Sequence, residues 1–380
     1  MRNSGNRPQP RRLAVRQWGH EPHESNGAGE GVRPVRKIRV LQACNQLAIG
    51  GTEKTLQVFS KYLDRSRFEV YACGLKSGGL RVQALEELGV PVIVQPADLT
   101  TLVRELKIDI YHVHRAGDSE PGTLPEKQQG WPRIVETNVF EAFDQVQDEL
   151  IDAHIFVSRF SRDRYLSRNR PKADVRYEAI YNPVDFDECA GGPSNFRNTI
   201  GRCSRADDQK WHDVCLKSLP KIFRKVPGVK CVIQGATDRV KGKLEKLGLA
   251  GQVTLLEPSL DVASFYRQID VFIHGSRVGE TFGCVIAEAM SNGIPVVTLS
   301  TPQRGKSNAQ AELVEHNVTG FVCRWRWQYA GAVIELLKNH ELRETFGRRS
   351  REKAREQFEA SRLTKELERL YGAVLDTSRG

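Results

Sequence analysis

Two glutamates near residue 280 attract attention because of their spacing and their surroundings. Glu280 and Glu288 belong to segment 274–300, HGSRVGETFGCVIAEAMSNGIPVVTLS, in which an apolar strand pattern gives way to a helical pattern that ends near Asn292. We predict that Glu280 to Gly283 opens this helix, so that the two carboxylates are about 12 Å apart along its axis. Carboxylates accept hydrogen bonds from paired hydroxyls, and free N–H groups at a helix start attract phosphate. The segment therefore suits a ligand with a sugar at one end, a ribose at the other and phosphate between them.

The combination of E-T-F-G, E-A-M and G-x-P-V-V in this segment resembles the E-x7-E element of glycosyltransferase family 4, a retaining family with the GT-B fold. The resemblance implies that Glu280 contacts the donor sugar and that Glu288 contacts the ribose. It also implies that the E-x-F-G turn, here Thr281, Phe282 and Gly283, contacts donor oxygens through its amides. A surface helix with two solvated glutamates is the alternative.

Two basic residues earlier in the chain could neutralise a diphosphate. Gly201-Arg202, with Lys210 downstream, resembles the G-R…K-G pair of the same family, which neutralises the donor diphosphate. When the anomeric bond breaks, negative charge grows on the leaving phosphate, and cations already in place stabilise it without a metal. The match departs from the family at Trp211-His212, where glycine is usual, so a solvated Lys210 is the alternative.

Glycines after predicted strands mark further candidate positions. Gly50-Gly51 follows the strand KIRVLQAC and resembles the family's glycine loop, which approaches donor phosphate and acceptor. A plain β–α turn would also use these glycines. We expect the nucleotide base to be contacted near Gly235 and the Glu257-Pro258 turn.

Two histidines lie on one face of the predicted strand IDIYHVH. His114, at its end, resembles the family histidine near the donor sugar and acceptor, where a neutral imidazole can relay a hydrogen bond. A core or capping role is the alternative for His114, and it is the expected role of His112.

Neither a metal nor an organic cofactor is expected, and a nucleotide sugar such as a UDP- or GDP-sugar would be a substrate. Asp185-Phe186-Asp187 is a D-x-D sequence, which can hold a divalent metal in another glycosyltransferase fold. Here it follows Asn182-Pro183 and matches the family's N-x-V-D linker instead. The eight cysteines are scattered without a C-x-x-C pair, and we expect buried free thiols in a reducing cytosol.

The elements that must position these residues alternate between apolar strands and amphipathic helices with short connections, which implies parallel, doubly wound sheets. We predict an α/β protein with two Rossmann-like domains facing across a cleft, and the resemblance implies that this is the GT-B fold. The expected parts are a flexible basic tail (1–36), an acceptor domain (37–185), a donor-binding domain (186–355) and a terminal helix that packs back on the N-terminal domain (356–380).

Composition and charge limit the class of protein and its partners. Hydrophobic residues make up 39% and charged residues 27% of the chain, as in soluble globular proteins, and the N-terminus shows no apolar secretory signal. We therefore expect a cytoplasmic protein, with peripheral contact to the inner membrane face as a further option. The net charge of +10 favours an anionic partner. An Arg-rich predicted helix at 159–172 could contact an anionic membrane surface or nucleic acid, although a solvated basic helix would look the same.

The resulting hypothesis is a retaining, metal-independent glycosyltransferase of the hexosyltransferase type, with a lipid, glycan, small molecule or nucleic-acid base as acceptor. Retention rests on the family resemblance alone. A nucleic-acid-binding protein on the same scaffold and a sugar-nucleotide epimerase-like relative are the alternatives. The sequence contains no recognised nucleic-acid-binding module, and the E-x7-E element together with Arg202 favours sugar transfer. Donor, acceptor and oligomeric state are left open.

Overall fold

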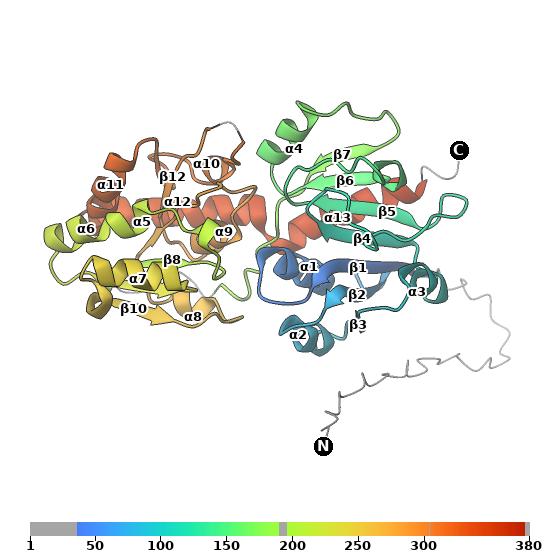
Figure 1. The fold of residues 1–380 in the computed structure, drawn as a ribbon, viewed down its shortest axis with the longest axis horizontal. Helices are drawn as coiled ribbons and strands as arrows, with labels where there is room; N and C mark the ends of the chain where they lie inside the picture. The colour runs from blue at the N-terminus through green and yellow to red at the C-terminus, as the bar shows by residue number, and fades with distance from the viewer. Residues whose placement is uncertain (1–35, 190–195, 304, 377–380) are drawn as a thin grey trace, which may run out of the picture. The chain divides into compact units, whose positions relative to one another are not determined.

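The computed structural model describes residues 36–189, 196–303 and 305–376. Within these ranges the strands form two sheets, one of seven strands and one of six, and neighbouring strands in each sheet run parallel (Figure 1). The prediction of two doubly wound, Rossmann-like units is therefore confirmed. The basic tail predicted for residues 1–36 lies, except for Arg36, outside the described residues.

The first sheet and its helices occupy the N-terminal half of the described chain. The elements are, in chain order, β1 (Ile38–Gln46), α1 (Gly51–Tyr62), β2 (Phe68–Ser77), α2 (Arg81–Glu87), β3 (Val92–Val94), α3 (Leu99–Glu105), β4 (Ile110–Arg115), β5 (Arg133–Asn138), η1 (Asp148–Leu150), β6 (Ala153–Phe156), α4 (Arg159–Leu166) and β7 (Arg176–Ala179). The strand order is β3-β2-β1-β4-β5-β6-β7, so the chain runs outward from β1 and then returns to place β4 on its other side. The loops after β1 and β4 thus diverge at the switch point, where sheets of this kind bind ligands.

The second sheet follows the same plan. The elements are, in chain order, β8 (Thr199–Cys203), η2 (Asp208–Lys210), α5 (Val214–Lys217), α6 (Leu219–Lys225), β9 (Lys230–Gln234), α7 (Asp238–Lys246), η3 (Ala250–Gln252), β10 (Val253–Leu256), α8 (Ala263–Tyr266), β11 (Val271–Ile273), α9 (Cys284–Ser291), β12 (Val296–Leu299), α10 (Gln310–Leu313), β13 (Gly320–Cys323), α11 (Arg326–Lys338), α12 (His340–Phe358) and α13 (Ala360–Asp376). Its strand order is β10-β9-β8-β11-β12-β13, which puts the switch point between β8 and β11.

Helix α9 begins later than its sequence pattern predicts. The helix starts at Cys284, and Gly283 before it has φ 102° and ψ 67°, a left-handed conformation that cannot be part of a right-handed helix. The backbone N–H of Glu280 is donated to the side chain of Gln310 instead of entering a helical turn. The prediction that Glu280 opens the helix is therefore wrong, and the distance along a helix axis does not apply to Glu280 and Glu288.

The basic helix predicted for 159–172 is also shorter than expected, because α4 ends at Leu166. Asn169 donates both its backbone and its side-chain N–H to the carbonyl of Tyr165 at 3.0 Å, but Pro171 disfavours helical backbone at the residue before it. Only the first part of the arginine-rich segment therefore presents a helical face.

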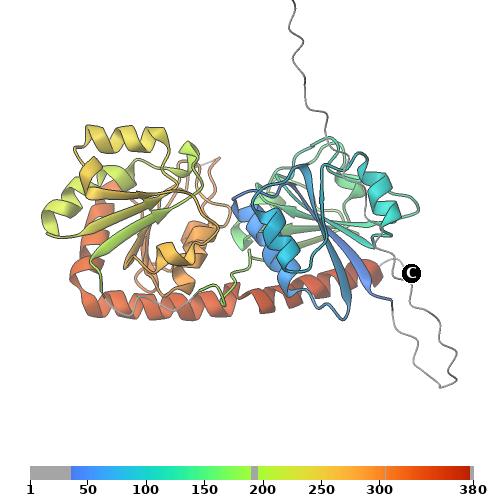
Figure 2. The same cartoon turned by 90° about the horizontal axis from the view of Figure 1, so that it is seen from below.

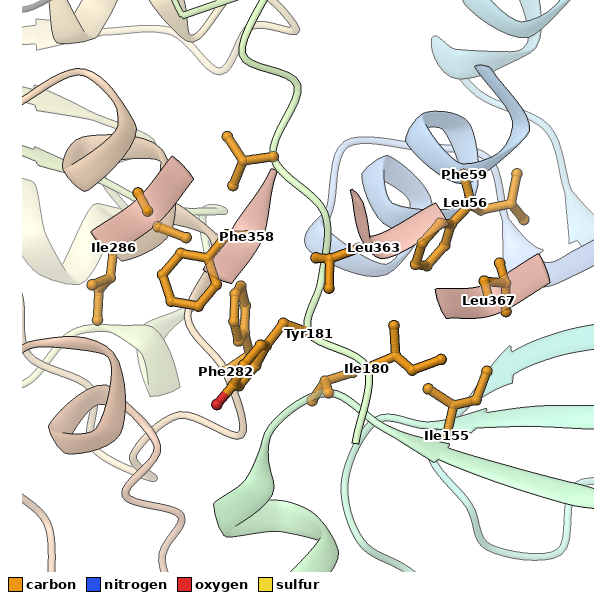
Figure 3. Close-up of a cluster of buried hydrophobic side chains, with 14 of the residues drawn as sticks. Leu56, Phe59, Ile155, Ile180, Tyr181, Phe282, Ile286, Phe358, Leu363 and Leu367 are labelled. Atoms are coloured by element: carbon orange, nitrogen blue, oxygen red, sulfur yellow. The ribbon is translucent and has the colours of Figure 1, made fainter. Parts of the chain in front are cut away.

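One hydrophobic cluster contains buried side chains from both halves of the chain. In Figure 3, Tyr181, Phe282 and Phe358 lie beside one another, with ring centroids 5.3–5.8 Å apart. Helices α12 and α13 continue from the second sheet to the first (Figure 2). There Tyr371 of α13 accepts a hydrogen bond from the Gln42 side chain at 2.9 Å. The two sheets are therefore joined through packed side chains as well as through the linking chain.

All eight cysteines are free; seven are buried and Cys284 is half-buried. None of the described helices has the length and apolar character that a membrane crossing requires.

A buried polar network lies at the carboxyl end of the first sheet. The Arg115 guanidinium contacts Glu136 at 2.6 Å and Asp144 at 2.8 Å. On the other side of Glu136, the His154 ring lies 2.7 Å from its carboxylate and 3.2 Å from that of Asp148. Buried charges are stable only when they are paired in this way, so the network links β4, β5 and β6.

We expect His154 to make the fold less stable as the pH rises from about 6.5 to about 8. Burial alone would lower its pKa, but hydrogen bonds and charges from Asp148 and Glu136 raise the pKa from 6.5 to about 8. Because the pKa is higher in the folded state, the added stability is fully present below the unfolded-state pKa and is lost as the pH passes the folded-state pKa. The contribution is about 2 kcal/mol.

Urea denaturation of the wild type and of His154→Gln at pH 6 and pH 9 measures this effect. The wild type should lose more stability between the two pH values than the variant does. His340→Gln, at an exposed histidine, is the matched control and should behave like the wild type. An identical pH dependence in His154→Gln would rule out this role of the ring.

Candidate functional site

A cavity of about 150 Å³ is formed by loops at the carboxyl ends of both sheets. The predicted site residues on its wall are Gly50, Gly51, Arg202, Lys210, Glu280, Thr281, Phe282 and Gly283. The predicted residues that are absent from its wall, all within the described chain, are His114, Gly235 and Glu288. Folding thus collects most of the residues that the motifs marked, from positions more than 200 apart in the sequence.

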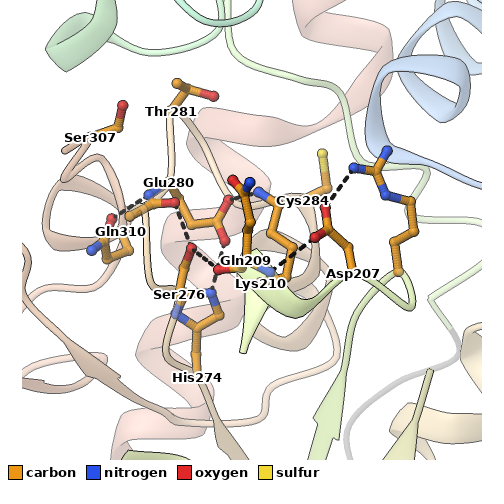
Figure 4. Close-up of polar contacts among 12 residues, drawn as sticks. Asp207, Gln209, Lys210, His274, Ser276, Glu280, Thr281, Cys284, Ser307 and Gln310 are labelled. Atoms are coloured by element: carbon orange, nitrogen blue, oxygen red, sulfur yellow. Dashed lines mark hydrogen bonds and ion pairs between the residues drawn. The ribbon is translucent and has the colours of Figure 1, made fainter. Parts of the chain in front are cut away.

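Glu280 is the centre of the polar contacts in this cavity (Figure 4). Its carboxylate lies 2.7 Å from the Lys210 ammonium and 3.3 Å from the Nε2 atom of His274. Burial opposes ionisation of this carboxyl, but the Lys210 charge and the His274 contact outweigh it and hold the pKa of Glu280 well below its ordinary value. Glu280 is therefore an anion with a fixed orientation, suited to accept hydrogen bonds from hydroxyls and unsuited to donate a proton.

His274 was not among the predicted site residues, although it is the first residue of the segment that contains Glu280. It ends the buried β11 pattern, and its Nδ1 lies 2.9 Å from the Thr298 hydroxyl. Burial, together with the charge of Arg202, lowers the pKa of His274 to about 4, so the ring is neutral near pH 7. A polar residue at the end of an apolar strand was the available signal.

Lys210 reaches the cavity from the short helix η2, which Asp207 caps through its side chain. The Lys210 side chain is 28% exposed, and its ion pair with Glu280 crosses between the loops after β8 and β11. This cation can therefore meet a ligand phosphate by turning from Glu280 toward the open side of the cavity.

Arg202 holds the segment that carries Lys210 through hydrogen bonds to backbone carbonyls. Its side chain is fully buried, and its two terminal nitrogens donate to the carbonyls of Cys203 and Lys210, each at 2.7 Å. The guanidinium carbon also lies 5.1 Å from the centroid of the Trp211 ring, which is itself fully buried. Trp211, which stands where the resemblance leads us to expect glycine, therefore packs against the Arg202 side chain. In this conformation the guanidinium fixes the backbone that carries Lys210.

The start of α9 provides backbone donors to the same cavity. The N–H groups of a first helical turn have no partner within the helix, and both Cys284 and Val285 lie on the cavity wall. The preceding turn is held from the other half of the chain, because the Ser158 and Ser161 hydroxyls donate to the Thr281 carbonyl at 2.6 and 3.1 Å. The helix start is therefore positioned to bind an anion.

Glu288 is buried on α9, but its carboxylate is already engaged. One oxygen lies 2.9 Å from the Lys54 ammonium of α1, and the other accepts from the Tyr266 hydroxyl at 2.9 Å. Burial opposes protonation of Lys54, yet the charges of Glu288 and Glu188 raise its pKa. In this conformation both oxygens of Glu288 are therefore engaged by protein side chains.

The two histidines of β4 are both buried. His114 Nε2 lies 2.8 Å from the Gln42 side-chain oxygen, and its Nδ1 has no hydrogen-bond partner among the described residues. Burial lowers the pKa of His114 to about 3, so the ring is neutral. His112 contacts the Tyr371 and Thr137 hydroxyls, and its expected place in the core is confirmed.

The marked glycines lie where a side chain would collide with a neighbouring segment. A Cβ atom on Gly51 would lie 2.9 Å from the Cys284 sulfur, so this glycine lets the start of α1 approach the start of α9. Gly235 has φ 77°, and a Cβ atom there would lie 1.9 Å from the Ser204 carbonyl oxygen. Both glycines therefore have a structural reason besides ligand contact.

The D-x-D sequence belongs to the connection between the two sheets. Asp185 accepts from the Tyr62 hydroxyl at 2.8 Å and is paired with Lys61, and Asp187 also accepts from Tyr62. Across the described residues, no three or more His, Cys, Asp or Glu side chains are grouped as metal ligands would be.

The topology and the cavity between two Rossmann-like units define the GT-B class. HepE from Anabaena, solved with UDP and glucose, has a TM-score of 0.69 and 18% identity, over 88% of this chain and 100% of that one. A glycosyltransferase from Rickettsia africae has a TM-score of 0.68 and 17% identity, over 90% of this chain and 99% of that one. The GT-B fold is thereby confirmed.

Residues 192–353, which form most of the second sheet and its helices, match the family model described as glycosyl transferases group 1. N-acetyl-alpha-D-glucosaminyl L-malate synthase of Bacillus anthracis is 29% identical over 174 residues, which is 40% of this chain and 44% of that protein. A GDP-mannose-dependent phosphatidylinositol monomannoside mannosyltransferase of Mycolicibacterium smegmatis is 28% identical over 193 residues, which is 45% of this chain and 48% of that protein. The chain thus spans about half the length of these relatives.

Proposed function

We propose that this protein is a retaining glycosyltransferase that moves a hexose-type sugar from a nucleotide-diphosphate sugar to an acceptor without using a metal ion. The observation that carries the proposal is the ion pair of Glu280 and Lys210 on a cavity wall that also contains the start of α9. A fixed carboxylate, a partly exposed cation and free backbone N–H groups are the partners that a sugar diphosphate requires.

In the proposed reaction, the donor diphosphate lies against Lys210 and the N–H groups of Cys284 and Val285, while Glu280 accepts hydrogen bonds from the sugar. As the bond between the sugar and the diphosphate breaks, the growing negative charge meets donors that are already oriented. The leaving phosphate oxygen takes the proton of the acceptor hydroxyl on the same face. This proton route suits Glu280, because a carboxyl with a lowered pKa is a poor proton carrier.

The named ligands of similar proteins support a nucleotide-sugar donor. HepE was solved with UDP-glucose as well as with UDP and glucose, and the mycobacterial relative depends on GDP-mannose by its name. These names differ in the base, so both UDP- and GDP-sugars belong in a test. Base contacts near Gly235 and Glu257 and a ribose contact by Glu288 are part of the proposal. An orienting role of His114 near the donor sugar and the acceptor is also part of the proposal.

The arginine-rich segment 159–172 is the candidate contact for the acceptor. In segment 159–172, Arg164 pairs with Glu141 at 3.2 Å, and Arg162 pairs with Asp163 at 2.8 Å. These two carboxylates offset the charge of the two arginines, whereas Arg168 and Arg170 are exposed. A lipid surface or a nucleic acid at this segment stays a prediction, as does a cytoplasmic location. A lipid, glycan, small molecule or nucleic-acid base therefore remains in the acceptor panel.

We expect at least one UDP- or GDP-sugar to raise the melting temperature of the protein and to release nucleotide when acceptors are added. Lys210→Met should weaken the binding of that donor by about 10- to 100-fold, because it removes a charged partner of the diphosphate. Thermal shift followed by calorimetry measures both effects.

The matched control is Lys246→Met, which removes an exposed lysine outside the cavity. Donor binding in this control should equal that of the wild type. The proposal fails if no nucleotide sugar stabilises the wild type, or if Lys210→Met binds the donor normally. Salt-dependent binding of DNA or RNA without any response to nucleotide sugars would favour the nucleic-acid alternative.

A further inference from the structure

A second cavity, of about 500 Å³, lies beyond the carboxyl ends of β8, β11, β12 and β13. This size is typical of sites for small organic ligands, and the end of the sheet is where α/β units bind them. Its wall includes His212, Asp213 and Trp327 together with five basic side chains. Among the described residues, none on this wall also lines the cavity around Glu280.

The wall of this second cavity has a large excess of positive charge. Five basic side chains line it: Lys217, Lys221, Arg277, Lys306 and Arg326. In the ranges that the structure describes, none of the five forms an ion pair with a carboxylate. Like charges repel one another, so five unpaired cations around one concave surface favour an anion inside it.

The one acidic residue of the wall does not neutralise these cations. Asp213 is bound to Arg239 at 2.9 Å and also to Lys243, and both of these residues belong to α7 outside the cavity. Its charge is therefore compensated elsewhere, and the five cations retain theirs.

Two further side chains indicate what kind of anion would fit. His212 Nδ1 accepts the N–H of Val214 at 3.0 Å, so a neutral His212 ring carries its proton on Nε2 and is a hydrogen-bond donor. Trp327 is 75% exposed and lines the cavity with an uncovered aromatic ring. An exposed ring of this size next to clustered cations suits a ligand that combines charged groups with a flat face of C–H groups.

We propose that this cavity is a second binding site, separate from the site around Glu280, and that it holds a phosphorylated sugar with its phosphates on the five cations and its ring against Trp327. A concave site of this volume encloses a small molecule, whereas a duplex nucleic acid or a membrane requires a wide convex or flat contact. The proposal stands on the cavity and its charges, and it holds whether or not the protein transfers sugars.

The two cavities share a backbone connection. The N–H of Arg277, on the wall of the second cavity, is donated to the carbonyl of Gln209 at 2.9 Å, and Gln209 precedes Lys210 in η2. An occupant that holds Arg277 would therefore also restrain the segment from which Lys210 reaches Glu280.

The test uses the full chain with fructose 1,6-bisphosphate and inorganic tripolyphosphate as probes in calorimetry. The double variant Lys217→Glu, Arg326→Glu should weaken the binding of both probes by about 100-fold, since two charged contacts become repulsive. Both side chains are exposed, and an acidic residue at the first position of α11 is favourable for that helix, so the variant should fold. Circular dichroism checks this.

Three further variants make the result specific. Arg349→Glu reverses an exposed arginine outside the cavity and should bind both probes normally. Lys210→Met should still bind them at the second cavity, which separates this site from the donor site. Trp327→Leu should weaken fructose 1,6-bisphosphate by about 10-fold and leave tripolyphosphate unchanged, because only the sugar has a ring to contact Trp327.

The proposal is overturned if the wild type binds neither probe below millimolar concentration, or if the double variant binds them like the wild type. Loss of both probes in Lys210→Met would assign the binding to the first cavity. An equal effect of Trp327→Leu on both probes would contradict the proposed contact between a sugar ring and Trp327. Tighter binding of single-stranded RNA, lost in the double variant, would replace the small ligand with a nucleic acid.

Discussion

Glu280→Gln is expected to lower sugar transfer by about 1,000-fold while leaving the affinity for the free nucleotide nearly unchanged. Gln has the same shape, but its neutral amide accepts hydrogen bonds from the sugar hydroxyls more weakly than the carboxylate does. The nucleotide part of the donor would contact the helix start and Lys210, which the substitution leaves in place. Steady-state kinetics with the donor found by thermal shift measures kcat, and calorimetry with the free nucleoside diphosphate measures affinity.

Glu356→Gln is the matched control, because this glutamate is exposed on α12 and far along the chain from the cavity. It should retain normal transfer. Because the pKa of Glu280 is lowered, its carboxylate stays charged through mildly acidic pH, and titration of Glu280 should not produce an acid limb in the rate profile between pH 5 and 7. Normal kcat in Glu280→Gln would remove the central residue of the proposed mechanism. An equal loss of nucleotide affinity would move its role from the sugar to the diphosphate.

Arg202→Met is expected to lower transfer by about 100-fold, through Lys210 and without any contact between Arg202 and the ligand. The guanidinium ties the Lys210 carbonyl to the Cys203 carbonyl, and Met can fill the space beside Trp211 but cannot donate to either oxygen. The segment that carries Lys210 would then lose its fixed position. Arg202→Lys keeps one charge but cannot reach both carbonyls, so it should recover only part of the activity.

A double-mutant cycle distinguishes this positioning role from the direct diphosphate contact that the family resemblance implies. If Arg202 acts through Lys210, the double variant Arg202→Met, Lys210→Met should be no slower than Lys210→Met alone. If both residues bind the diphosphate, their effects on donor affinity should add. Urea denaturation of each variant shows whether the remaining protein is folded under the assay conditions. Additive losses in folded variants would contradict the positioning role.

The strands and helices of this protein could be predicted from local patterns, because the spacing of apolar residues within each segment and the turn residues between segments can be read from the sequence. The run KIRVLQAC forms β1, IDIYHVH forms β4, and the apolar runs of the second half form β8 to β13. The spacing predicts too early a start for α9, because the helical spacing continues through Glu280, whereas the left-handed Gly283 interrupts the helix. Spacing alone does not report the sign of φ at a glycine, which depends on the contacts around it.

The composition of the candidate site was partly predictable for a different reason. Glu280, Arg202 and Lys210 lie in motifs, and the switch point of a doubly wound sheet brings strand ends together. Their partners were not predictable in the same way. Lys54 is 234 positions from Glu288, and neither local pattern indicates that the two form an ion pair. Likewise the burial of Arg202 against Trp211 follows from packing under η2, and a charged residue in a motif looks the same whether it faces a ligand or the core.

By itself, then, the sequence determined the order of strands and helices, the two Rossmann-like units and the family that the motif resembles, because these depend on patterns within short segments. Only the tertiary structure decided that Glu280 is held by Lys210 and His274, that Glu288 is engaged by Lys54, and that five cations surround a second cavity. These depend on which distant side chains meet after the strands have been placed. These tertiary contacts set the hydrogen-bond partners, the burial and the pKa of each side chain, because residues far away in the chain supply most of the charge around a group and exclude solvent from it.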